Sequence, residues 1–207
     1  MIRPSSKQEL KKIIEQKIIE EGVECNLNDI NTSLIGDMSF LFYGSKFNGD
    51  ISKWNVSNVT NMNSMFMDSI FNGDISKWNV SKVTNMGYMF FHSQFLGDIS
   101  EWNVSNVIDM MYMFYMSKFD GIMSKWEVSN VKYMSYMFYG SRFQGDISNW
   151  NTSNVTDMSH MFAFSPFNRD ISKWNMNNVK YMANMFEGCS IPDGHKPINC
   201  FKEKQNG

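Results

Sequence analysis

Tryptophan recurs along this chain at a fixed interval of 24 residues. The six tryptophans occupy positions 54, 78, 102, 126, 150 and 174, and a phenylalanine series from Phe42 to Phe186 keeps the same interval. A second phenylalanine series runs from Phe47 to Phe167 and ends at Ile191. Series without insertions are typical of repeat proteins, in which each repeat forms one layer of a stack. The sequence therefore predicts a solenoid.

The repeat unit is the 24-residue segment from Phe47 to Ile70. Trp54 and Val56 alternate with polar residues, as in a short strand. The apolar residues between Val59 and Phe66 are spaced as on one face of a short helical turn. Asn-Gly-Asp at 48–50 is typical of a turn. We therefore expect an α/β repeat solenoid with one short strand and one short helical turn in each of about seven repeats, spanning residues 27–190.

The repeats resemble a known family. The frame I-x-x-W-x-V fits the L-x-x-L-x-L frame of leucine-rich repeats. The segments F-N-G-D-I-S-K-W (47–54), W-N-V-S-N-V-T-N-M-N-S-M-F (54–66) and D-I-N-T-S-L-I-G-D-M-S-F-L-F (29–42) closely resemble repeats of the BspA-like leucine-rich-repeat surface proteins. The resemblance covers roughly residues 27–190 and implies a non-enzymatic solenoid. We expect this solenoid to be right-handed and leucine-rich-repeat-like. The resemblance also implies display at a cell surface and adhesion or host-protein binding.

Residues 1–26 are predicted to cap the first layer with an amphipathic helix over Ser6–Glu21. Ser6 and Glu9 fit a capping box, and Gly22 is a natural stop. The apolar stripe consists of Leu10, Ile13, Ile14 and Ile18. A membrane-surface helix is the alternative, but the polar face mixes Lys and Glu and has no aromatic anchor. We therefore favour a cap.

Residues 191–207 leave the repeat pattern. Pro192, Gly194 and Pro197 predict a loop-rich tail. Whether Cys189 and Cys200 pair stays open, because disulfides are rare in a reducing compartment.

Charge and hydropathy restrict the partners. The net charge of −2 and the pI of about 5.9 argue against a nucleic-acid-binding surface. No apolar run approaches the roughly 20 residues of a spanning helix, so we expect no membrane insertion. The N-terminus does not resemble a signal peptide, which favours a cytoplasmic protein. The family resemblance instead suggests a cell-surface or secreted one.

Catalysis has little support in the sequence. His92, His160 and His195 are scattered, and no grouping typical of an active site is visible. We expect no enzyme, no catalytic residue, no cofactor and no metal site.

One column of carboxylates leaves an alternative open. Its members are Asp50, Asp74, Asp98, Asp146 and Asp170, and Ile122 interrupts it. Stacked carboxylates are able to hold calcium, whereas Asp in a turn usually accepts a backbone N–H. The break at Ile122 favours the turn.

The tryptophan column has two interpretations. It is either a platform on which sugars or bases stack, or part of the core. Because it occupies a leucine position of the strand frame, we favour the core.

The helix-like segment points six aromatic side chains outward. They occupy the positions equivalent to 64 and 67 in the middle repeats: Tyr88, Phe91, Tyr112, Tyr115, Tyr136 and Tyr139. A return loop or the next layer covers them, or they form a protein-binding surface, since tyrosine is enriched at interfaces. We favour a non-catalytic recognition or adhesion protein that binds a protein partner through this convex strip. The alternatives are a self-assembling structural protein, or a calcium- or carbohydrate-binding adhesin module.

Overall fold

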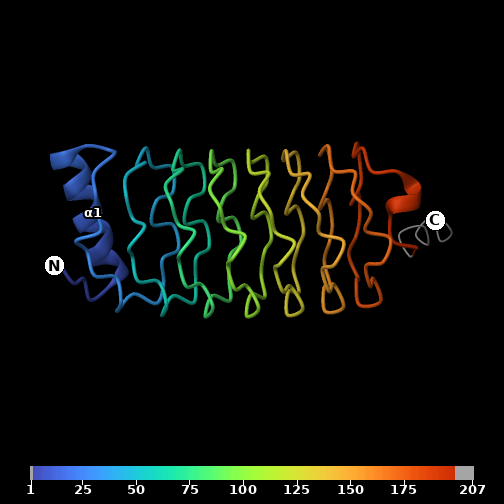
Figure 1. The fold of residues 1–207 in the computed structure, drawn as a ribbon, viewed down its shortest axis with the longest axis horizontal. Coiled ribbons are helices and arrows are strands. Elements are labelled where there is room, and N and C mark those ends of the chain that lie inside the picture. Colours follow the sequence, from blue (N-terminus) through green and yellow to red (C-terminus); the bar gives the residue numbers. More distant parts are fainter. Residues whose placement is uncertain (1, 199–207) are drawn as a thin grey trace.

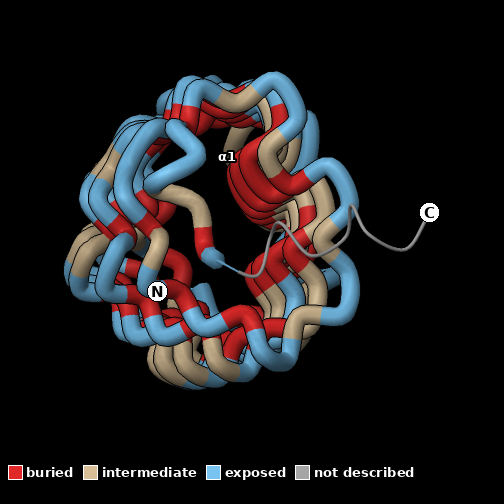
Figure 2. The backbone as a smooth tube through the Cα atoms, turned by 90° about the vertical axis from the view of Figure 1, so that its right-hand side faces the viewer, coloured by how far each residue is buried: buried red, intermediate tan, exposed pale blue. Residues whose placement is uncertain are grey.

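The structure is a computed structural model that describes residues 2–198. The chain winds into coils that lie side by side along a straight axis, with the first described residues at one end and the last described residues at the other (Figure 1). Viewed along that axis, the coils superimpose, and buried positions line their inner side (Figure 2). Within residues 2–198 the helices are α1, Lys7–Glu21, and the short 3-10 helix η1, Asp193–His195.

One segment of each coil, which we call the ladder segment, carries most of the backbone pairing between neighbouring coils. In the second coil it comprises residues 61–68. The N–H groups of Met62, Ser64, Phe66 and Asp68 donate to the carbonyl oxygens of Asn85, Gly87, Met89 and Phe91 at 2.8–3.0 Å. The same four bonds recur at every interface from residues 37–44 to residues 181–188. Parallel bridges at positions equivalent to Asn61 and Asn85 mark the same segment.

The local conformation differs from the predicted strand and helical turn. Trp54–Val56 forms no bridge. Six bridges lie at the ladder segments instead, and the other two, Ile2–Ile30 and Asn26–Asp50, lie near the N-terminal end. The predicted helical segment is a series of turns, because Ser64 and Asp68 both adopt the left-handed region at φ 56°. Alternate N–H groups then pair with the next coil, and the N–H groups of Met65 and Met67 donate to carbonyls three residues back, whereas an α-helix would use carbonyls four residues back. The right-handed, leucine-rich-repeat-like architecture stays a prediction.

Columns of equivalent side chains fill the interior. Phe66 and Phe90 stack at 5.7 Å between ring centroids, and Trp54 and Trp78 at 6.5 Å. Every tryptophan side chain is at most 5% exposed. Each indole N–H donates to a carbonyl 27 residues earlier in the chain. The interpretation of the tryptophan column as core is confirmed.

Helix α1 begins and ends where the sequence predicts. The Ser6 side chain accepts the N–H of Glu9 at 3.2 Å, and Gly22 ends the helix at φ 93°. The Glu9 carboxylate contacts Ser5 instead of completing the capping box. Leu10 and Ile14 are fully buried against the core.

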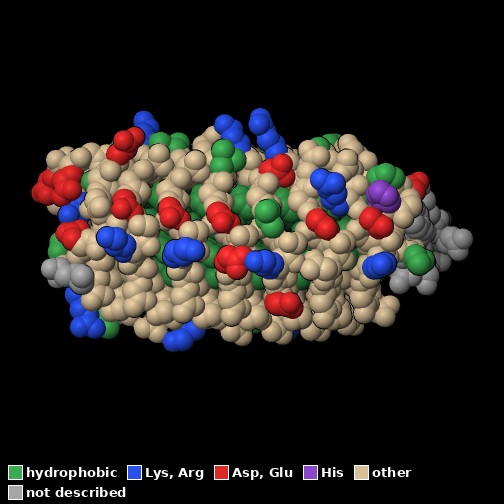
Figure 3. Space-filling view, in the orientation of Figure 1, with side chains coloured by type: hydrophobic (Ala, Val, Ile, Leu, Met, Phe, Trp, Pro, Cys, Tyr) green, Lys and Arg blue, Asp and Glu red, His purple; other side chains and the backbone are tan. Residues whose placement is uncertain are grey.

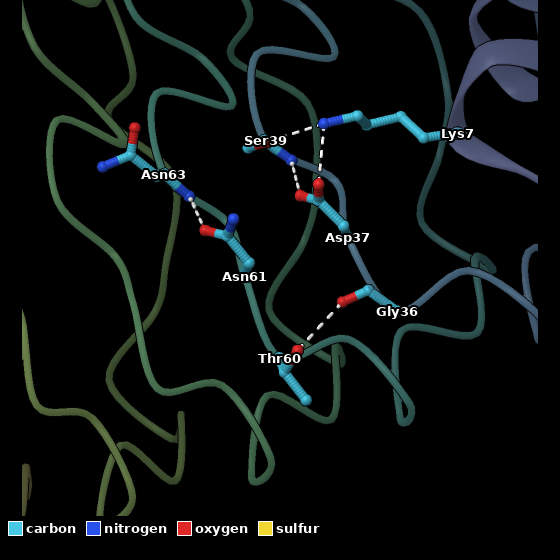
Figure 4. Close-up of polar contacts among 7 residues, drawn as sticks. All are labelled: Lys7, Gly36, Asp37, Ser39, Thr60, Asn61 and Asn63. Carbon is cyan, nitrogen blue, oxygen red and sulfur yellow. Dashed lines mark hydrogen bonds and ion pairs between the residues drawn. The ribbon is translucent and has the colours of Figure 1, made fainter.

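A polar contact fixes the start of α1 to the first coil (Figure 4). The Lys7 ammonium lies 2.7 Å from a carboxylate oxygen of Asp37 and 2.8 Å from the hydroxyl of Ser39. The other carboxylate oxygen of Asp37 accepts the Ser39 N–H at 2.8 Å. In the next coil, Asn61 accepts the N–H of Asn63 in the same way, at 3.0 Å.

The tail returns to the last coils. The carbonyl of His195 accepts the N–H of Ile171 at 2.9 Å, and Ile191 is buried. Cys189 donates to the carbonyl of Phe167 at 3.2 Å. Cys200 lies outside the described residues, and with it the question of a Cys189–Cys200 pair.

Candidate functional site

The six predicted residues Tyr88, Phe91, Tyr112, Tyr115, Tyr136 and Tyr139 come together as one surface, the aromatic strip. They form two columns of stacked rings, and all six are half-buried. In the first column, ring centroids are 4.6 Å apart from Tyr88 to Tyr112 and 4.5 Å from Tyr112 to Tyr136. In the second, they are 4.6 Å apart from Phe91 to Tyr115 and 4.8 Å from Tyr115 to Tyr139.

The ladder segment explains this stacking. Tyr88, Tyr112 and Tyr136 have φ values of 57–59°, so the left-handed conformation turns each ring to the same side of its coil. Backbone hydrogen bonds hold paired chains about 4.7–4.9 Å apart. Neighbouring rings are therefore held at the spacing that parallel aromatic planes prefer.

Rings of neighbouring coils cover one another, so the alternative in which the next layer covers them holds in part, and all six side chains remain half-buried. The central rings of Tyr112, Tyr115 and Tyr136 each have a stacked ring on both faces. None of the five tyrosine hydroxyls of the strip has a hydrogen-bond partner among residues 2–198. The strip thus presents apolar ring edges together with unpaired hydroxyls.

The hydroxyls of Tyr88, Tyr112 and Tyr115 stay protonated. Burial raises the pKa of Tyr88 and Tyr115, and raises that of Tyr112 to about 12, where neighbouring tyrosines add to the effect. All three groups are therefore hydrogen-bond donors at any physiological pH.

The strip continues into the following coil through two further rings. His160 stacks on Tyr136 at 4.4 Å, and Phe164 packs edge-on against Tyr139 at 5.4 Å. Phe164 is 53% exposed. The repeat pattern did not predict this ring. Phe164 is equivalent to position 68, one residue after the outward position 67. It adopts the left-handed region, which a helical period does not reveal.

The first coil carries an aromatic pair at the equivalent positions. Phe40 and Tyr43 are about half exposed and contact each other edge-to-face at 6.2 Å. Ser64 and Met67 of the second coil separate them from the strip. Outward aromatic residues are therefore not confined to the middle coils, but the continuous stack is.

The aspartate column caps turns, as the favoured hypothesis predicts. Each carboxylate of Asp50, Asp74, Asp98, Asp146 and Asp170 accepts the N–H of the serine two residues later, at 2.9 Å. These hydrogen bonds lower the pKa of all five carboxyls. The row of acidic side chains crosses one face beside a row rich in lysine (Figure 3). Within residues 2–198, no group of three or more His, Cys, Asp and Glu is placed to hold a metal ion.

The three histidines lie in separate environments. His92 contacts Asp68 at 3.3 Å, His160 contacts Asn184, and His195 contacts the carbonyl of Asn168. The structure does not bring them together.

Comparison with known proteins identifies a family. The family model described as "Mycoplasma protein of unknown function, DUF285" matches residues 9–120 and again residues 92–197. The two matches overlap, as the internal repetition of this sequence allows. No curated protein and no solved structure matches the chain. In the part of the chain that the structure describes, no helix is both long and apolar enough to cross a membrane.

Proposed function

The chain belongs to the DUF285 family of proteins of unknown function, and from this premise we propose that it is a non-catalytic recognition protein that binds a protein partner through the aromatic strip. The supporting observation is the stack of six half-buried aromatic rings on the outside of the coils. Apolar surface of this kind is usually functional. Tyrosine is enriched at protein interfaces because it joins a large apolar ring to a polar end.

The stacked rings are suited to rigid recognition. Each ring is held by its neighbours, so little side-chain entropy is lost when a partner binds. The five hydroxyls supply donors at a spacing fixed by the backbone ladder. A partner with apolar side chains and carbonyl or carboxylate acceptors would match both features.

The resemblance to BspA-like surface proteins extends the proposal to adhesion and to display at a cell surface. It is carried by the repeat sequence, for example at residues 47–66. The proposed partner is then a protein outside the cell.

The geometry favours a protein partner over the carbohydrate and calcium alternatives. A sugar stacks on an exposed ring face, but both ring faces of Tyr112 and Tyr115 are covered by neighbouring rings. Calcium needs several oxygen ligands, while one oxygen of each column aspartate already accepts a backbone N–H.

The test is the double variant Tyr112→Ser with Tyr136→Ser. Serine already occupies this position in the second coil, where Ser64 has φ 56°. A partner captured by the wild-type protein is purified and titrated against both proteins by calorimetry. We expect binding to weaken at least tenfold, because central aromatic residues dominate interface energies.

Tyr181→Ser is the matched control, since Tyr181 is 64% exposed and lies outside the strip. Circular dichroism verifies that both variants are folded. Unchanged affinity of the folded double variant would contradict the assignment of the strip.

A further inference from the structure

The two ends of the stack carry complementary backbone groups. At each interior interface, four N–H groups of one ladder segment donate to four carbonyls of the next. In the last coil, the corresponding N–H groups have no acceptor among residues 2–198; they belong to Met182, Asn184, Phe186 and Gly188. In the first coil, the corresponding carbonyls have no donor among those residues; they belong to Asp37, Ser39, Leu41 and Tyr43.

The interior of the last coil is incompletely covered as well. Phe162 is fully buried between Phe138 and Phe186, whereas Phe186 is only half-buried. The Lys196 ammonium lies 5.6 Å from the centre of the Phe186 ring. The His195 carbonyl pairs with Ile171, away from the ladder segment. The C-terminal end therefore exposes apolar surface beside the four N–H groups.

The first coil is covered differently. Helix α1 places Leu10 and Ile14 against the core and Lys7 against side chains of the ladder segment. It donates no hydrogen bond to the four ladder carbonyls. The helix thus shields apolar surface without replacing the backbone pairing that every interior coil has.

We propose that the C-terminal end of the stack is a docking surface for the first coil of a second copy of this chain, which becomes accessible when α1 leaves its position. The edge at residues 182–188 presents donors only, whereas an ordinary β-strand alternates donors and acceptors along its edge. The first coil presents four carbonyls at matching positions, and its Phe42 continues the column that ends at Phe186. Such head-to-tail contact does not close on itself and extends into filaments.

Helix α1 competes with this contact. An attached segment acts at an effective concentration in the millimolar range. The intact protein therefore stays monomeric at micromolar concentration, and weakening α1 shifts the balance toward assembly.

The experiment compares wild-type protein with the double variant Leu10→Asp and Ile14→Asp by light scattering after size exclusion. The control is Ile19→Asp on the same helix, where the side chain is 78% exposed. We expect wild type and control to keep the mass of a 24.1 kDa monomer. The double variant is expected to form species whose mass grows with concentration, visible as filaments by electron microscopy. A folded double variant that remains monomeric at high micromolar concentration would overturn the proposal.

Two further variants separate docking from unfolding and aggregation. Lys7→Ala removes the contacts to Asp37 and Ser39 while Leu10 and Ile14 stay buried. If the double variant is unfolded, this variant tests whether weakening α1 shifts the protein toward assembly. Adding Phe186→Asp to either variant places a charge on the docking surface and should stop assembly. Assembly that continues with Phe186→Asp would show unspecific association and overturn the proposal.

Discussion

The indole nitrogen of Trp78 donates a hydrogen bond of 3.2 Å to the carbonyl oxygen of Ile51 in the preceding coil. The same carbonyl accepts the backbone N–H of Trp54 at 3.1 Å, which closes a turn within its own coil. Both acceptor sites of a buried oxygen are thus used, one locally and one between coils. The tryptophan column therefore links the conformation of each coil to the stacking of the next.

Trp102→Phe is expected to destabilise the protein by about 1–3 kcal/mol. The substitution removes the 3.1 Å hydrogen bond to the Ile75 carbonyl and leaves a small cavity in a fully packed column. Urea unfolding followed by circular dichroism measures the change. Lys77→Ala is the control, because its side chain is exposed. Equal stability of the two variants would show that the indole bond does not contribute.

Asp109→Asn is expected to stabilise the protein at neutral pH. Burial raises the pKa of the Asp109 carboxyl, so folding favours its protonated form. As the pH rises above the unfolded-state pKa of about 3.9, the ionised carboxyl therefore lowers the stability of the folded protein. Asparagine stands at the equivalent positions 61 and 85 and retains the acceptor for the Met111 N–H. The melting temperature should rise at pH 7, and the difference should shrink toward pH 4.

Asp74→Asn is the matched comparison, and it is expected to lower stability at neutral pH rather than raise it. Hydrogen bonds from Ser76 lower the pKa of Asp74, so its ionised form adds stability above the unfolded pKa, and that contribution is lost as the pH falls through the folded value. This variant should melt below wild type at pH 7. Shifts of the same sign in both variants would contradict the assigned electrostatics.

Substitutions of Met116 test whether the left-handed positions of the ladder segment strain the backbone. Met116 has φ 46°, and glycine occupies the equivalent positions 44, 140 and 188. Met116→Gly should keep or slightly raise stability, because glycine adopts this region without strain. Met116→Val should be less stable than Met116→Gly by about 1–2 kcal/mol, because a branched side chain clashes there. Thermal unfolding compares the two. A valine variant as stable as the glycine variant would show that the backbone has relaxed.

The period of 24 residues and the identity of the core were readable from the sequence. An apolar side chain repeated at a fixed interval must meet its equivalents when layers stack, so the Trp54 and Phe66 columns follow from spacing alone. Ser6 and Gly22 likewise marked the ends of α1, since capping depends on adjacent residues. The outward positions of the aromatic strip followed from the same local pattern.

The predicted helical turn was wrong for a physical reason. Apolar residues spaced three and one apart suit a helical turn, but they equally suit consecutive turns broken by left-handed residues such as Ser64 and Asp68. Side-chain pattern does not distinguish these two backbones, because the choice depends on where each N–H finds its acceptor.

The sequence by itself determined which side chains repeat, which of them are buried and where α1 begins and ends, since these properties arise from spacing and from neighbouring residues. Only the tertiary structure decided that Tyr88 and Tyr112 stack face to face. It also decided that, among the described residues, one end of the stack carries unpaired N–H groups and the other unpaired carbonyls. Both features depend on hydrogen bonds between residues 23 apart in the sequence. Such pairing cannot be recognised from the sequence of a single repeat.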